Sequence, residues 1–170
     1  MLSGFEQAKK EWVFYTDGDG QYDVLELRKL LPIIQEGINV INGYKIFRSD
    51  PVHRIIIGKL YLTLIRLLFQ FQVLDVDCDF RLIRKEALKS IRPRHTSGVI
   101  CLELVKKLEL VGYRFVEYPI HHYFRLFGRS QFLNFRRLFY TAVNIFELMI
   151  LRKTVVNSAY QQERDRCVVQ

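Results

Sequence analysis

Cysteine is scarce in this chain of 170 residues, and its placement excludes several classes of protein. The three cysteines, Cys78, Cys101 and Cys167, are odd in number, lie far apart and include no C-x-x-C pair. Neither a disulfide-stapled secreted domain nor a structural zinc site is therefore predicted. We expect reduced thiols in a cytoplasmic protein.

The chain also has little that could direct it into a membrane or cross one. Its first twelve residues, MLSGFEQAKKEW, contain no apolar core of the signal-peptide type. The longest apolar stretches, 55–71 and 139–151, are interrupted by Lys59, Arg66 and Glu147, so neither is predicted to span a bilayer. Internal repeats, low-complexity blocks and linkers are absent from the sequence as well.

The residues that are present fit one globular domain with a basic surface. Hydrophobic residues make up 49% of the chain, enough for a core at this length. Only the polar stretch 157–170 is predicted to be disordered. The excess of 26 Lys and Arg over 18 Asp and Glu indicates an anionic partner: nucleic acid, a phosphorylated metabolite or an anionic membrane surface.

Hydrophobic periodicity predicts alternating strands and helices, which favours an α/β layer structure. Strands are expected over 12–16, 39–46, 80–83 and 114–123. Helices are expected after Asp23 up to Gly37, from 49 to 71, over 85–90, over 97–112 and over 133–152.

The stretch "FYTDGDGQYD" is the clearest chemical signal, because it places oxygen ligands at the end of a buried strand. Asp17 and Asp19 stand two residues apart, and Gln21 follows. Such oxygens suit Mg²⁺ or Mn²⁺, which keep positions for substrate phosphates, and strand ends are where open α/β sheets bind ligands. A plain surface turn is the alternative, since Asp and Gly are common in turns.

Four stretches together resemble one protein family. They are "YTDGDGQYDVLEL", "VLDVDCDFRLIRKEAL", "EYPIHHYFRLFGRSQF" and the helix between the last two. They resemble glycosyltransferase family 2, and within it the polyprenyl-phosphate sugar synthases of the dolichol-phosphate mannosyltransferase type. The resemblance implies a GT-A-like, Rossmann-like mixed sheet flanked by helices, a nucleotide-sugar donor, a divalent metal and inverting transfer of the sugar.

The motif match also implies roles for individual residues. Asp17, Asp19 and Gln21 would hold the metal, and Asp75 would be the acidic residue of the loop before a Phe80-Arg81 pair. Arg125 would join Asp75 in catalysis. Substrate contacts would come from Lys45, Arg54, Arg81, Glu103, Arg129 and Ser130. Cys78 and Asp79 replace a common Ser-Gly step, which leaves the acceptor open.

The chemistry of the acceptor decides which residues the reaction would need. A lipid phosphate is already anionic, because its second pKa is about 6, so it needs cations such as Arg125, Arg129 and Arg54 rather than a base. A sugar hydroxyl would need a carboxylate base, for which Glu103 or Asp75 is the candidate. The alternatives are a solvated helix position for Glu103 and a solvated turn for the arginines.

The resemblance runs from about Gly4 to Leu151. It implies that residues 1–156 form the C-terminal two-thirds of the family domain, without its first strands. The leading interpretation is an enzyme with a nucleotide-sugar donor and a lipid-phosphate acceptor and no nucleic-acid partner. Two alternatives stay open: an inactive remnant that acts as an interaction module, and a basic nucleic-acid-binding domain. The last predicted helix either packs on the domain or lies on the inner face of the membrane, because basic amphipathic helices favour anionic lipid.

Overall fold

The structure is a computed structural model that describes residues 1–46, 52–91, 93, 99–124 and 143–146, with the backbone alone for His53 and Arg54. Its strands are β1 (Trp12–Thr16), β2 (Val40–Ile46), β3 (Phe80–Arg84) and β4 (Phe115–His121). Its helices are α1 (Leu2–Gln7), α2 (Leu27–Leu30), α3 (Val52–Phe69), α4 (Lys85–Ser90) and α5 (Ile100–Leu110), with 3₁₀ turns η1 (Val24–Glu26) and η2 (Leu31–Ile33).

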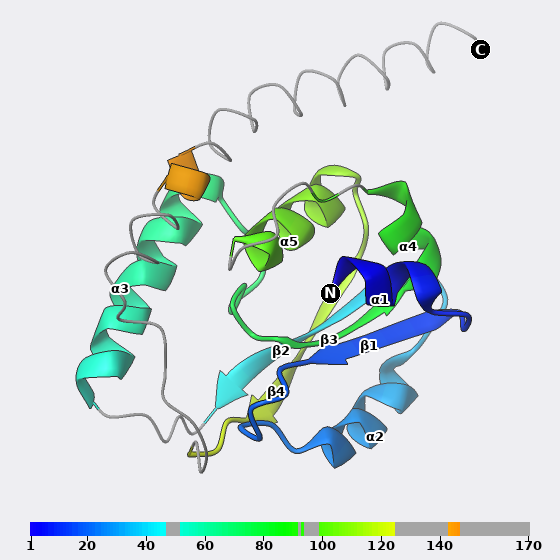
Figure 1. The fold of residues 1–170 in the computed structure, drawn as a ribbon, viewed down its shortest axis with the longest axis horizontal. Helices are drawn as coiled ribbons and strands as arrows, with labels where there is room; N and C mark the ends of the chain where they lie inside the picture. Colours follow the sequence, from blue (N-terminus) through cyan, green and yellow to red (C-terminus); the bar gives the residue numbers. More distant parts are fainter. Residues whose placement is uncertain (47–51, 92, 94–98, 125–142, 147–170) are drawn as a thin grey trace, which may run out of the picture.

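The four strands form one mixed sheet in the order β1-β3-β2-β4 (Figure 1). β3 runs antiparallel to both β1 and β2, whereas β2 and β4 are parallel. β1, β2 and β4 therefore point the same way. The C-terminal ends of these three strands and the loop that precedes β3 consequently lie at a single edge of the sheet.

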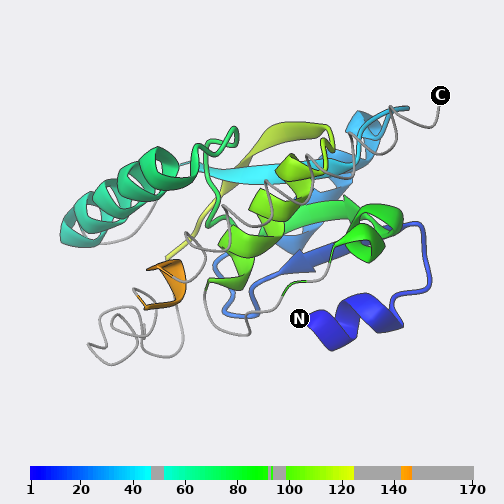
Figure 2. The same cartoon turned by 90° about the horizontal axis from the view of Figure 1, so that it is seen from above.

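Side chains that alternate along the strands pack into separate clusters on the two faces of this sheet. One cluster joins Val13, Val40 and Ile83 to residues of α4 and α5, including Leu88 and Leu104. The other gathers Ile41, Phe80, Leu82 and Ile120 with Leu30 of α2. Figure 2 shows α4 and α5 lying along the sheet. The molecule is thus layered, as an α/β structure should be.

All four predicted strands are confirmed, and most helices are found where the pattern placed them. The helix after Asp23 is shorter and broken: η1, α2 and η2 follow one another, with Pro32 in the last of them. Asp23 caps the start as expected, since its Oδ1 accepts a hydrogen bond from Leu25 N at 2.9 Å. α1 was not predicted. Of the expected last helix, the described residues 143–146 are helical.

Among the described residues, no helix combines the length and apolar character needed to cross a bilayer.

Gly43 is a point of close packing between three strands. A Cβ at this position would lie 2.9 Å from both the Phe80 carbonyl oxygen and Ile120 Cγ1, and 3.1 Å from Cys78 Sγ. The carbonyl belongs to the backbone of β3, so it cannot move aside without disturbing the sheet. Only glycine fits here, and it lets β2 approach the loop that precedes β3.

We predict that Gly43→Ala lowers the free energy of unfolding by about 1–3 kcal/mol, the usual cost of overpacking. Urea unfolding followed by circular dichroism measures this change. Gly4→Ala is the matched control, because nothing lies within 4 Å of a Cβ at Gly4 in α1. That variant should be neutral or more stable by up to about 1 kcal/mol. An unchanged midpoint for Gly43→Ala would contradict the packing described.

Candidate functional site

The acidic loop follows β1 at the edge where the strand ends meet. Asp17 is exposed and Asp19 is partly exposed. Asp19 Oδ1 accepts a hydrogen bond from Gln21 N at 3.0 Å, and Gly20 turns the chain with a φ of 74°, a conformation that favours glycine. The two predicted metal-binding carboxylates therefore sit on a tight turn at the surface.

Gln21 ties this acidic loop to the end of β4. Its side-chain Nε2 donates to the Tyr123 carbonyl at 3.0 Å, and Tyr123 N donates to the Gln21 carbonyl at 2.9 Å. Gln21 itself is buried. These bonds hold Tyr123 beside the acidic loop. In the sequence, the basic stretch 125–131 begins two residues after Tyr123. The pairing gives Gln21 a positioning role, while its role as a metal ligand stays a prediction.

The loop 75–79, which precedes β3, reaches the same edge and holds Lys45 at the end of β2. Asp75 Oδ2 accepts from Lys45 N at 3.3 Å and lies 3.7 Å from Lys45 Nζ. Lys45 Nζ also donates to the Asp77 carbonyl at 2.8 Å. The ammonium group is therefore engaged by the loop, and a substrate contact by Lys45 would have to compete with these bonds.

Asp75 has one carboxylate oxygen left over. Asp75 is buried, and its Oδ1 has no hydrogen-bond partner among the described residues. A buried acceptor without a donor costs free energy, and such atoms concentrate at functional sites. This oxygen fits the catalytic role predicted for Asp75.

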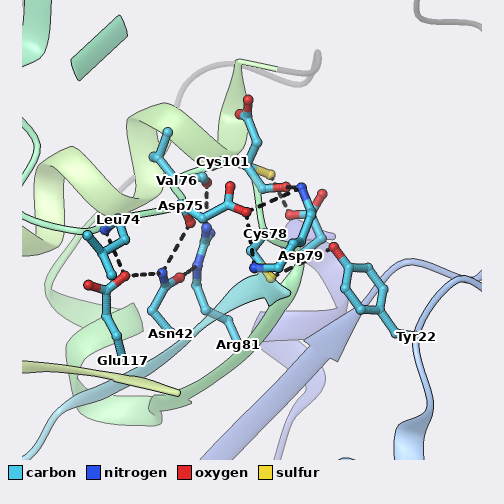
Figure 3. Close-up of polar contacts among 12 residues, drawn as sticks. Tyr22, Asn42, Leu74, Asp75, Val76, Cys78, Asp79, Arg81, Cys101 and Glu117 are labelled. Carbon is cyan, nitrogen blue, oxygen red and sulfur yellow. Dashed lines mark hydrogen bonds and ion pairs between the residues drawn. The ribbon is translucent and has the colours of Figure 1, made fainter. Parts of the chain in front are cut away.

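Arg81 lies inside the fold and is completely buried. Its guanidinium group donates to Asn42 Oδ1 and the Val76 carbonyl (Figure 3). It also donates to the Tyr15 hydroxyl oxygen. Burial acts to lower the pKa of Arg81, but Tyr15 and the neighbouring anionic groups raise it above its usual range. The side chain lies beneath the loop that it supports, and the substrate contact predicted for Arg81 stays a prediction.

Asn42 extends the same network from the middle of β2. Its Nδ2 donates to the Asp75 carbonyl at 3.1 Å and to Glu117 Oε1 at 3.3 Å. Glu117 Oε1 also accepts from Leu74 N at 2.8 Å. Side chains from three strands thus hold the backbone of residues 74–76 (Figure 3). Asn42, Glu117 and Tyr15 were missed from the sequence, where the only signal was a polar residue inside an apolar strand.

Glu103 is not the solvated glutamate of the alternative interpretation. It is buried within α5 and forms an ion pair with Lys107 Nζ at 2.6 Å. The sequence pattern of α5 suggested one apolar face and one solvent-facing side. Near its start the helix is buried on both sides, from Ile100 to Val105, so Glu103 does not face solvent. A substrate contact by Glu103 stays a prediction.

The adjacent histidines His121 and His122, at the end of β4 and just after it, differ in surroundings. His121 donates from its backbone N to Glu26 Oε2 at 3.0 Å, and its Nδ1 lies 2.8 Å from Glu26 Oε1. Burial acts to raise the pKa of Glu26, but hydrogen bonds from Lys29 and His121 outweigh it and lower the pKa. His122 is buried against the Tyr22 ring. Both therefore help to fix β4 beside the acidic loop.

Several predicted residues lie outside the described part of the structure. These are the side chain of Arg54 and the whole of Arg125, Arg129 and Ser130. Their predicted roles at the anionic substrate groups stay predictions.

The donor set of the acidic loop fits a hard divalent cation better than a soft one. It consists of two carboxylates with an amide two residues on, and oxygen ligands suit Mg²⁺ and Mn²⁺. Among the described residues, no group of three or more His, Cys, Asp or Glu side chains could hold a metal by itself. A cation bound by Asp17, Asp19 and Gln21 would therefore take its remaining ligands from water and phosphate oxygens.

The loop 75–79 carries a carboxyl group, that of Asp77, whose pKa is raised. Burial raises the pKa of Asp77 to about 6, assisted by Asp75 and Asp79 and opposed by Lys45. The ordinary value is 3.8, so the folded state binds this proton more tightly than the unfolded chain. Stability should consequently fall as the pH rises from about 4 to about 6, and this contribution should be constant above that window.

We predict that Asp77→Asn removes this slope. Relative to the wild type, the variant should gain on the order of 1–3 kcal/mol of unfolding free energy between pH 4 and pH 7. Thermal or urea unfolding across this range measures the effect. Glu86→Gln, an exposed carboxyl on α4, is the matched control and should leave the profile as it is. Parallel profiles for Asp77→Asn and the wild type would contradict the burial of this carboxyl.

Comparison with known proteins agrees with this fold. An uncharacterized protein of Methanocaldococcus jannaschii is 27% identical over 123 residues, which is 66% of this chain and 54% of the relative. The structure of glucosyl-3-phosphoglycerate synthase from Mycobacterium tuberculosis, in complex with phosphoglyceric acid, matches with a TM-score of 0.57 and 15% identity, over 76% of this chain and 46% of that chain. The fold is therefore similar to that of GT-A glycosyltransferases, and the chain spans about half the length of each of these proteins.

The match to a family model covers both acidic loops and the strands β1, β2 and β3. The model for glycosyl transferase family 2 matches residues 1–92, which is more than half of the chain. The chain belongs to glycosyl transferase family 2.

Proposed function

We propose that this protein is a metal-dependent, inverting glycosyltransferase that moves a sugar from a nucleotide-sugar donor to a polyprenyl phosphate. Membership of the family supports sugar transfer. The single observation that carries the proposal is that three segments far apart in the sequence meet at one edge of the sheet. They are the acidic turn after β1, the loop 75–79 and the end of β4.

The acidic turn would serve the donor diphosphate. Asp17 and Asp19, with Gln21 as a third ligand, would hold Mg²⁺ or Mn²⁺. When bound, such a cation supplies Lewis-acid stabilisation of the leaving diphosphate. Two carboxylates alone would repel a diphosphate, so the turn makes chemical sense beside phosphates only with a cation between them.

The basic side of the edge would serve the acceptor. A phosphate monoester is anionic near neutral pH, so its oxygen can form the bond to the anomeric carbon as the carbon–oxygen bond to the diphosphate breaks. Attack from the opposite face inverts the configuration at that carbon. Arg125, Arg129 and Arg54 are the side chains proposed to orient the acceptor phosphate, because arginine forks match phosphate oxygens.

We predict that Mn²⁺ and a nucleoside diphosphate together raise the melting temperature of the wild type, and that neither does so alone to the same extent. Asp17→Asn and Asp19→Asn should each abolish the joint effect, because an amide is a much weaker ligand for the cation. Differential scanning fluorimetry with a panel of nucleoside diphosphates measures this. Asp23→Asn, which preserves a cap at η1, is the matched control. Protection that survives in both Asn variants would sink the metal assignment.

A hydroxyl acceptor is the second candidate, and the lone Oδ1 of Asp75 favours it. A hydroxyl must lose its proton as it attacks, so it needs a positioned base. Asp75 offers a buried carboxylate oxygen with no partner among the described residues, at the edge where the acceptor would bind. A phosphate acceptor would not use this oxygen as a base.

We predict that Asp75→Asn separates the two acceptors. If a hydroxyl is the acceptor, transfer should fall by about 10²–10⁴-fold, the usual contribution of a general base. If polyprenyl phosphate is the acceptor, the rate should fall far less. Release of nucleoside diphosphate in the presence of each acceptor class measures this. The control is protection by Mn²⁺ and nucleoside diphosphate, which Asp75→Asn should leave in place.

A further inference from the structure

The helix α3 is apolar on two opposite sides, and the described part of the chain buries one of them. Ile65 and Phe69 face inward and are buried in a cluster with the segment 71–76 and α5. The outward side carries large apolar side chains that are more than half exposed: Val52, Ile56, Leu60, Leu64 and Leu67. Leu60 and Leu67 are 67% and 76% exposed. A helix that is apolar all round is normally covered on every side.

The outward residues form a continuous stripe. They recur every three or four positions along 18 residues, which places them on one face of the helix. The polar residue among them, Thr63, donates its hydroxyl to the Lys59 carbonyl at 2.8 Å. The hydroxyl donor of Thr63 is therefore satisfied within the helix and needs no water molecule on this face. In both views α3 lies at the rim of the molecule (Figures 1 and 2).

The charges beside the stripe are of one sign. Lys59 and Arg66 are exposed and flank the stripe by helical position, and residues 52–69 contain no Asp or Glu. A second copy packed on this face would bring like charges together without a carboxylate to balance them. An anionic lipid surface instead accepts both features, since apolar side chains enter the acyl boundary while Lys and Arg meet the headgroups.

We propose that the outward face of α3 docks in the plane of an anionic lipid surface, with Leu60 and Leu67 inserted and Lys59 and Arg66 at the headgroups. This inference differs from the sequence-based prediction, which gave a membrane role only to the last helix. It rests on the proposed function for its biological use, because a lipid-linked acceptor lies in such a surface. Its physical basis is the apolar stripe together with the basic residues beside it.

Co-sedimentation with vesicles tests the proposal on the full chain. The wild type should bind vesicles of phosphatidylcholine mixed with phosphatidylglycerol and should bind pure phosphatidylcholine much more weakly. Added salt should weaken the binding, because it screens the charges. Lys59→Gln and Arg66→Gln should each weaken binding about fivefold, in line with the usual contribution of one basic residue near such a surface.

The apolar contribution is tested by replacing exposed leucines. Leu60→Asp and Leu67→Asp should each weaken vesicle binding about tenfold or more, as expected when an inserted leucine is lost. Both positions are exposed, so the fold should persist, which circular dichroism checks. Leu31→Asp is the matched control: Leu31 is an exposed leucine in η2 and should leave vesicle binding unchanged.

Three results would overturn the proposal. The wild type fails to bind anionic vesicles, or Leu60→Asp and Leu67→Asp bind as well as the wild type. The third is a wild-type dimer that binds no vesicles and becomes monomeric in Leu60→Asp, which would assign the stripe to a second copy. Protection by Mn²⁺ and nucleoside diphosphate should be unchanged in the leucine variants, so a failure of the donor site and a failure of the lipid surface give different results.

Discussion

The buried guanidinium group of Arg81 is the interaction on which the functional edge depends. A charge without solvent must find hydrogen-bond partners, because an unpaired one costs several kcal/mol, roughly. Arg81 finds three: Asn42 in β2, Tyr15 in β1 and the carbonyl of Val76 in the loop before β3. It therefore joins two neighbouring strands to the loop that carries Asp75 and Asp77. Arg81 therefore acts on the site by holding in place the backbone of the loop that carries Asp75 and Asp77.

The other contacts at this edge follow from that anchorage. Asn42 holds the carbonyl of Asp75, Lys45 joins Asp75 to Asp77, and Gly43 allows β2 to approach Phe80 and Cys78. On the other side, Gln21 and Tyr123 join the acidic turn to the end of β4. Residues far apart in the sequence thus form one rim, with two carboxylates on a surface turn and Tyr123 bonded to Gln21 beside them. Such a rim suits a cation and phosphates.

Sequence reasoning worked where one local pattern decided the structure. The apolar runs gave all four strands, and Asp23 gave the start of the first broken helix. Sequence reasoning failed where contacts between distant segments determine the surroundings of a side chain. Arg81, Glu103 and Lys45 were predicted to contact the substrate, and no sequence pattern indicated that each forms bonds inside the fold. Asn42 and Glu117 lack any motif, and only the strand order brings them together. The outward stripe of α3 was hidden because apolar residues on both faces leave no one-sided pattern.

The most direct test of the account is anomalous diffraction from crystals grown with Mn²⁺ and a nucleoside diphosphate. The account predicts a manganese peak between the carboxylates of Asp17 and Asp19, in contact with diphosphate oxygens at the edge where β1, β2 and β4 end. A nucleotide bound elsewhere, or a peak with neither carboxylate within coordination distance, would contradict it.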